Sequence, residues 1–425
     1  MKAPPLRHAL REHSLTLYPV SALGLLLISN SFAETAFTVL GPDLRNELGM
    51  TTGELATAMS VQFLALTVAP MTLAFLSGNR PRRAALSIAT GLVWSLATAA
   101  VGLTGGMAGL MLVLLVFGLA NGSTVALHSP LLVDTYPPAV RARVLTLYGA
   151  ASAAAYVVAP LLVSALTGWL DLGWRAVFLT LGGLATLMCL CALGLRDPGV
   201  GRFEPAADAR KGLWPVVRSL LRIPTVRRLM AGFAVFGALQ VPVSTLVSVH
   251  LEERWDLTAD ARGLYFTCAA VAMLITLVVS GRFLDGMFQT SPGRVAVASG
   301  VTVAGSALAY TAGILAPALP LALALFLAAA AAQAHIIPAT QLMSLSVISP
   351  AHRAHASALF ALAIAVGGLF GAGVLAGFEQ ALGAAGSVAA IAVPGLLAAF
   401  VIASARRTLP ADLLALRAAE PEGAK

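Results

Sequence analysis

The sequence predicts an all-α membrane protein with twelve transmembrane helices in two pseudo-symmetric six-helix bundles. Three features support this fold class: the composition, the spacing of apolar segments and an internal repeat. Hydrophobic residues make up 58% of the 425 residues, and charged residues only 11%. A water-facing surface needs roughly a quarter of its residues charged, so hydrocarbon must surround most of this chain.

Twelve apolar segments are long enough to cross a bilayer core, which requires about 20 residues of helix. Charges, glycines or prolines bound each of them. Their limits are 17–40, 54–77, 84–103, 107–133, 145–167, 176–195, 229–249, 263–281, 295–315, 320–347, 354–377 and 383–403.

The basic residues indicate the orientation of these segments. Of the 27 Lys and Arg residues, all but Arg45, Arg175, Arg254 and Arg262 fall on one side of the predicted membrane. Because cytoplasmic loops carry the excess of Lys and Arg, we expect a multi-pass protein of the inner cell membrane with both termini in the cytoplasm. One alternative is that the basic start and the first apolar run form a cleavable signal peptide, which would leave eleven spans.

An internal repeat predicts two halves. Residues 48–52 align with 255–259, and residues 138–143 match 350–355 at four of six positions. The stretch between the two halves, residues 196–228, is rich in charge and proline, so it is the natural linker. We therefore expect a first bundle at 1–195, a cytoplasmic linker at 196–228, a second bundle at 229–405 and a cytoplasmic tail at 406–425.

Several motifs resemble those of the major facilitator superfamily. Residues 281–285 (Gly-Arg-Phe-Leu-Asp), followed by 293–294 (Gly-Arg), are similar to its signature between the second and third helices of a half. The copy in the first half is degraded, with Gly78 where an aspartate is expected. Residues 136–138 and 173–175 are also similar to this superfamily. The resemblance implies a secondary transporter whose halves rock around a central site, with no enzymatic activity and no cofactor.

Glu34 is the one acidic residue well inside a predicted span. A carboxylate in the membrane is costly, so we expect it to carry the coupling proton or to bind another coupling ion. Asn30 and Thr38, four residues away on either side, share its helical face. The alternative is that Glu34 lies in a hydrated outer mouth and only solubilises it.

Further polar side chains share one depth near the middle of their spans. The resemblance implies that helices 1, 4, 7 and 10 line the central cavity, so several of these residues are expected to bind substrate. The alternative is that each is a hydrogen-bond partner between helices. Because Gln333 and His335 are two residues apart, we expect one of the two to face inward. The candidates are Asn30, Gln62, Asn121, Tyr156, Gln240, Gln333 and His335.

A second set of charged residues lies at the predicted cytoplasmic ends of the helices. By analogy with the superfamily, Asp285 would meet the start of the fifth helix near Arg141 when the inner side is closed, and Arg282 and Arg353 would complete this gate. Because Gly78 replaces the aspartate in the other half, the gate should be one-sided.

The sequence has no phosphate-binding loop of the G-x-x-x-x-G-K-[ST] type, so an ion or solute gradient must drive transport. A site of amides, phenol and imidazole without Lys or Arg suits lipophilic or weakly polar, neutral or cationic compounds. This favours a resemblance to the twelve-span drug/proton efflux branch. Two departures weaken it: residues 116–122 contain no Arg, and Ala159 precedes Pro160 where that branch usually has Gly-Pro.

Two other functions remain open at this point. The same fold would serve an uptake permease for a small metabolite, or a non-transporting sensor or scaffold. The expected partners are a small-molecule substrate, membrane lipids and protons or another coupling ion, and we expect a monomer. No basic patch of the nucleic-acid-binding kind is present, and the three cysteines lie in apolar runs that predict neither a metal site nor a disulfide.

Overall fold

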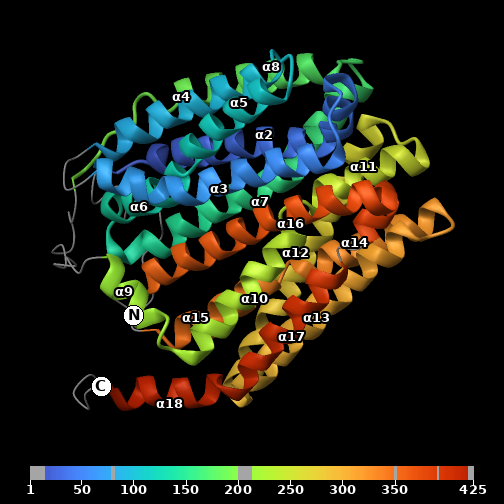
Figure 1. Ribbon diagram of the computed structural model, residues 1–425. Helices are drawn as coiled ribbons and strands as arrows, with labels where there is room; N and C mark the ends of the chain where they lie inside the picture. The colour runs from blue at the N-terminus through green and yellow to red at the C-terminus, as the bar shows by residue number, and fades with distance from the viewer. Residues whose placement is uncertain (1–14, 78–81, 200–212, 349–351, 390–391, 420–425) are drawn as a thin grey trace. The chain divides into compact units, whose positions relative to one another are not determined.

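The computed structural model describes residues 15–77, 82–199, 213–348, 352–389 and 392–419. Every regular element in these ranges is a helix (Figure 1). Helices satisfy their own backbone hydrogen bonds, which hydrocarbon cannot do, so long apolar segments fold in this way in a membrane. The predicted all-α membrane fold is confirmed.

The first six predicted spans each coincide with a helix or a broken helix. Span 4 is divided among three elements, α5, η1 and α6. The helices are α2 (Tyr18–Leu48), α3 (Thr52–Ser77), α4 (Arg83–Val101), α5 (Met107–Asn121), the π-helix η1 (Thr124–His128), α6 (Ser129–Thr135), α7 (Pro138–Gly168) and α8 (Trp174–Leu190).

The last six predicted spans also coincide with helices, and two of them are divided. The short helix α9 precedes them, and α18 follows them. The elements are α9 (Leu213–Leu220), α10 (Pro224–Gln240), α11 (Val243–Trp255), α12 (Ala259–Thr290), α13 (Pro292–Ile314), α14 (Leu319–Gln333), α15 (Ile336–Ser346), α16 (Arg353–Ala389), α17 (Ala392–Ser404), the 3-10 turn η3 (Ala405–Arg407) and α18 (Leu409–Ala419).

The predicted boundary between the last two spans is wrong. The eleventh span was expected to end near residue 377, but α16 continues to Ala389 and α17 begins only at Ala392. The intervening segment is rich in alanine, a strong helix former, and has no proline to stop it. Pro394 sits in the first turn of α17, where a missing backbone N–H does least harm.

By length and hydropathy, eight of the described helices qualify as membrane spans, or nine if the bent pair Ala392–Arg407 and Leu409–Leu416 counts as one. The remaining three predicted spans correspond to α3 and to the shorter apolar helices α5 and α8. The chain is therefore a multi-pass membrane protein.

The chain forms two compact units. Unit 1 comprises Met1–Met50, Val61–Asp208 and Leu257–Thr267, and unit 2 comprises Thr51–Ser60, Ala209–Asp256 and Cys268–Lys425. In unit 1, α2 packs on α7 and α8, and α4 packs on α8 and α5. In unit 2, α10 packs on α16 and α17, and α13 packs on α17 and α14.

Small residues bring these helices close together, as membrane helices require. In unit 1, a Cβ at Gly118 or Gly122 of α5 would collide with α3, at Gln62 and at Ala69. In unit 2, a Cβ at Gly367 or Gly371 of α16 would collide with the backbone of α10. These contacts fix the positions of the polar residues that lie beside them.

Candidate functional site

Three spans are interrupted near their middle, and each interruption lies beside a predicted substrate residue. Helix α5 ends at Asn121 and a π-helix follows. Helix α10 ends at Gln240, and α14 ends at Gln333, with His335 as the N-cap residue of α15. Interrupted spans expose backbone polar groups at mid-membrane depth, and such breaks occur where transporters bind their substrates.

Each interruption has a proline within it or just after it. The three residues, Pro130, Pro242 and Pro338, lack the N–H that a continuous helix would donate to the carbonyl four residues earlier. In the second half, Val241 N–H still bonds the Gly237 carbonyl at 3.1 Å, and the next turn begins with Leu246 N–H on Pro242 at 2.9 Å. In the first half, the π-helix before Pro130 changes the hydrogen-bond pattern of the turn in which the proline N–H is missing.

Within unit 1, the structure joins Glu34 to Asn121. The Asn121 side chain donates a hydrogen bond from Nδ2 to Glu34 Oε1 at 3.1 Å. Asn121 is buried because the flanking Gly118 and Gly122 hold α5 against α3. Glu34 is partly buried on α2, and Thr38 caps its backbone carbonyl at 3.0 Å. The expected proton carrier thus contacts an expected substrate residue at a broken span.

Most of the predicted substrate residues have one polar atom that is buried and makes no hydrogen bond within the described chain. Leaving such an atom unpaired costs about 1–3 kcal/mol. An unpaired group of this kind, inside its own span, can bond a polar group of a solute. The atoms are Asn30 Oδ1, Gln62 Oε1, Asn121 Oδ1, Gln240 Oε1, Gln333 Nε2 and His335 Nδ1.

Tyr156 and His335 differ from the others in their surroundings. Tyr156, on α7, has 59% of its surface exposed. His335 Nε2 pairs with the Thr302 hydroxyl of α13 at 3.1 Å, which fixes its ring. The helix is interrupted between Gln333 and His335, and the expectation that one of the two faces inward stays a prediction.

A buried histidine was missed from the sequence. His128 is fully buried at the end of η1, and its Nδ1 lies 2.8 Å from the Tyr148 hydroxyl of α7. Its Nε2 has no partner among the described residues. The signal was available, because a lone imidazole inside the apolar run 107–133 is an intramembrane polar group of the kind that marks function.

The predicted gate residues fall outside what the structure describes in side-chain detail. The backbones of Arg141, Arg282, Asp285 and Arg353 lie in α7, α12 and α16, but their side chains are not among the described ones. The one-sided gate therefore stays a prediction.

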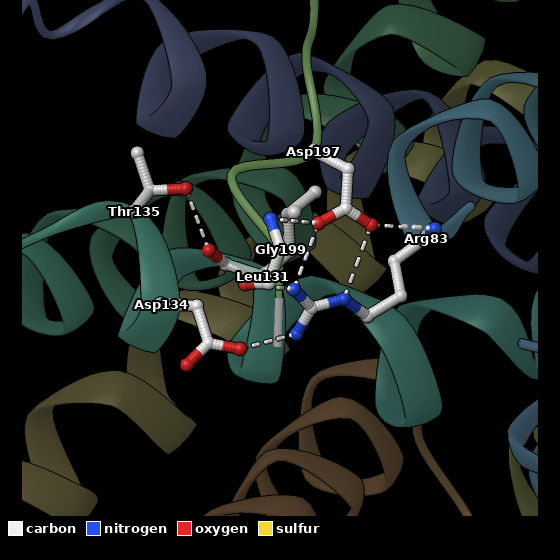
Figure 2. Close-up of polar contacts among 6 residues, drawn as sticks. All are labelled: Arg83, Leu131, Asp134, Thr135, Asp197 and Gly199. Carbon is white, nitrogen blue, oxygen red and sulfur yellow. Dashed lines mark hydrogen bonds and ion pairs between the residues drawn. The ribbon is translucent and has the colours of Figure 1, made fainter. Parts of the chain in front are cut away.

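An ion-pair cluster that the sequence did not reveal lies at one end of unit 1 (Figure 2). Arg83, the first residue of α4, pairs with Asp134 of α6 and with Asp197 after α8, the latter at 2.8 Å. Asp197 also accepts the backbone N–H groups of Arg83 at 2.8 Å and Gly199 at 3.0 Å. Although burial opposes its charge, the hydrogen bonds from Arg83 and Gly199 leave the pKa of Asp197 below its usual value.

Another ion pair lies where α2 ends, also within unit 1. Arg262, near the start of α12, pairs with Asp43, and only 1% of its side chain is exposed. Beside it, the Ser164 hydroxyl of α7 donates to the Asp260 carbonyl at 2.8 Å. A Cβ on Gly263 would lie 2.9 Å from the Pro160 carbonyl. The sequence placed Arg262 in an outer loop, whereas it belongs to a packed helix.

Membrane helices that are interrupted beside polar side chains are typical of transporters. The sequence profile of the Major Facilitator Superfamily matches residues 23–305, and the chain belongs to this superfamily. It is therefore a secondary transporter rather than an enzyme. None of the curated proteins compared with the chain matches it.

Solved structures share this fold. A bacterial homolog of the human lysosomal transporter Spinster, inward-facing and unoccupied, is 21% identical with a TM-score of 0.82, over 93% of this chain and 98% of that one. A mutant of the nucleoside transporter NupG is 14% identical with a TM-score of 0.72, over 92% and 99%. The peptide transporter POT in complex with sulfate is 14% identical with a TM-score of 0.74, over 93% and 95%.

Proposed function

We propose that the protein is a proton-coupled exporter of small, weakly polar organic compounds that are neutral or carry one positive charge. The observation that carries this proposal is the position of Asn121, Gln240 and Gln333 at the interruptions of three spans. Their unpaired amide atoms offer both donors and acceptors to a solute.

The charge inventory supports the substrate class. Buried arginines in the described chain are Arg45, Arg83 and Arg262, all in the first or last turns of helices. The mid-depth groups are amides, imidazole, phenol and the carboxylate of Glu34. A phosphate or a carboxylate substrate would find no cation there, and its desolvation would be uncompensated. Zwitterionic peptides, as suggested by the POT structures, fit less well than a neutral heterocycle of the nucleoside kind or a lipophilic cation.

The proposed coupling runs through one amide group. Asn121 Nδ2 binds Glu34, whereas Asn121 Oδ1 has no partner in the described chain. Ionised Glu34 holds Asn121 Nδ2 and so keeps the unpaired Asn121 Oδ1 oriented toward a solute, whereas protonated Glu34 is a weaker acceptor and lets the amide turn away. Substrate binding therefore favours loss of the proton from Glu34, and protonation favours release of the substrate, which is the requirement for antiport.

The wider arrangement completes the proposal. From the distribution of basic residues we propose an inner-membrane protein that has both termini in the cytoplasm and acts as a monomer. The proposed bundles are 1–195 and 229–405, and the proposed inner gate is the set Asp285, Arg282, Arg141 and Arg353. We also propose kinship to the drug/proton efflux branch. That branch usually has an Arg in its fourth helix, and we propose that Glu34, in the first span, takes over the role of this Arg in proton coupling.

Flux measurements with the purified chain in liposomes test the proposal. Three probes are compared with and without an imposed pH gradient: the lipophilic cation ethidium, radiolabelled uridine and the dipeptide Ala-Ala. We expect ethidium or uridine to move against the proton gradient, and the dipeptide not to move. Uptake along the proton gradient would instead indicate a permease, and ligand binding without flux would indicate a sensor.

A further inference from the structure

Helices α9 and α18 belong to unit 2 but do not continue its long bundle helices (Figure 1). The segment Leu409–Leu416 of α18 is bent by 47° from Ala392–Arg407. Helix α9 is a separate eight-residue helix that packs against α16 and ends three residues before α10 starts. Short helices at the ends of spans lie where the bilayer meets water.

Direct hydrogen bonds hold the start of α10 to α18, so both helices occupy the same end of unit 2. Asp412 of α18 accepts the Thr225 backbone N–H at 2.8 Å, at the positive end of the α10 dipole. The Thr225 hydroxyl bonds the Thr408 hydroxyl at 2.9 Å. Arg228 donates to the Ser404 carbonyl at 3.0 Å.

Helix α9 has one buried face and one exposed face, and the exposed face carries a tryptophan. Val216 and Leu220 are buried on one face. The opposite face exposes Arg218 and 70% of Trp214, which is four residues earlier and therefore adjacent on the helix surface. Tryptophan has an apolar ring and a polar N–H, and membrane proteins concentrate it at the headgroup level. This face suits a lipid boundary better than water.

Exposed arginines lie on and just after α9, at the start of α10 and on η3, at this end of unit 2. We call them the basic rim: Arg218, Arg222, Arg227, Arg406 and Arg407. None of their side chains makes an ion pair or hydrogen bond with a described residue. Asp412 is the one acid within 213–230 and 404–419, and its carboxylate accepts the backbone N–H of Thr225. Leu414 of α18 adds an apolar side chain that is 66% exposed.

We propose that the basic rim binds the anionic headgroups of phospholipids in the leaflet that the topology assigns to the cytoplasm. Guanidinium groups pair with phosphate oxygens in two parallel hydrogen bonds, and the exposed Trp214 and Leu414 enter the layer between headgroups and acyl chains. With Asp412 as the one acid in 213–230 and 404–419, these five positive charges attract phosphatidylglycerol over zwitterionic lipids. A soluble polyanion would gain the charge contact but would leave the exposed apolar side chains in water.

Quenching of tryptophan fluorescence by brominated lipids tests this binding in the full chain, reconstituted in phosphatidylcholine vesicles. The contribution of Trp214 is isolated by subtracting the signal of Trp214→Phe. We expect brominated phosphatidylglycerol to quench Trp214 about twofold more than brominated phosphatidylcholine at equal mole fraction. The variant R218Q/R222Q/R406Q/R407Q should lose this preference.

The matched control is Arg254→Gln, since Arg254 is an exposed arginine at the far end of α11. It should keep the full preference. A double variant, R218Q/R222Q, should lose part of the preference if the larger variant fails to reconstitute. Equal quenching by both lipids in the wild-type chain would overturn the proposal. So would a preference that millimolar inorganic phosphate or a short oligonucleotide abolishes, because the rim would then bind free phosphate or a soluble polyanion. The readout is independent of transport.

Discussion

At the level of single residues, the proposed coupling depends on the hydrogen bond between Glu34 of α2 and Asn121 of α5. Glu34 stood out because an acid in an apolar run is costly, and Asn121 because of its depth. Their hydrogen bond joins residues 87 positions apart, and no local pattern predicts such a contact. His128 and Asp197 were overlooked because their partners, Tyr148 and Arg83, also lie on distant helices.

Glu34→Gln tests the residue proposed to carry the proton. The amide keeps the size and hydrogen bonding of the carboxyl group but cannot change charge. We expect downhill movement of the substrate to persist while its response to a pH gradient is lost, measured as flux in proteoliposomes. Asp171→Asn is the control, because Asp171 is an exposed acid whose left-handed backbone also suits asparagine. Flux of Glu34→Gln that still follows the pH gradient would refute the assignment.

Asp197→Asn tests the ion-pair cluster. Removing this charge leaves the buried Arg83 guanidinium with Asp134 as its one acidic partner in the described chain, and we expect a loss of roughly 2 kcal/mol in stability at neutral pH. The folded pKa of Asp197 is depressed, so its contribution is complete above the unfolded pKa of about 4 and is lost as pH falls through the folded value.

Thermal unfolding in detergent at pH 7 and pH 3 measures this effect. The wild-type chain should lose more stability on acidification than Asp197→Asn, since the variant has already lost the contribution. An equal loss in both chains would show that the cluster does not depend on the charge of Asp197.

At the scale of elements, the positions of the spans followed from hydrophobicity, but their interruptions did not. Proline marks all three breaks, yet Pro42, Pro70 and Pro160 lie inside helices that continue. A proline alone therefore does not determine whether a helix stops. Packing against a neighbouring helix also matters. Gly371 brings α16 against Ala238, and the Ala238 carbonyl lacks its usual N–H donor because residue 242 is a proline.

Pro242→Ala tests the role of the interruption between α10 and α11. Alanine restores the missing N–H and favours a continuous helix, so the protein should become more stable by about 1 kcal/mol while transport slows severalfold. Melting temperature and flux are measured on the same preparation. Pro320→Ala is the control, because Pro320 lies in the first turn of α14, where its effect should be small. Unchanged flux in Pro242→Ala would show that transport does not depend on the interruption between α10 and α11.

At the scale of the whole molecule, the sequence predicted the fold class and the superfamily, because hydropathy and motifs extend over the entire chain. The exact membership of the two compact units was not predictable. The beginning of α3 groups with unit 2, and the beginning of α12 with unit 1. Contacts such as the Arg262–Asp43 pair and the Ser164–Asp260 hydrogen bond depend on side chains that the repeat does not align.

Arg262→Gln tests whether this pair holds the start of α12. Without it, Asp43 loses a buried partner, and the contact around Ser164 should open more often. In a background with the three cysteines replaced by serine, a cysteine at position 164 should react severalfold faster with an impermeant maleimide. Arg254→Gln should leave the rate unchanged. Equal rates in the two variants would show that other contacts hold the helix.

Coupling between the solute and a proton on Glu34 can be measured without any imposed gradient. Vesicles that contain the protein are loaded with substrate and a pH-sensitive dye and are then diluted into substrate-free buffer. Outward movement of substrate should acidify the vesicle interior in the wild-type chain and not in Glu34→Gln. Substrate efflux with no change of internal pH in the wild-type chain would show that the proton on Glu34 is not coupled to transport.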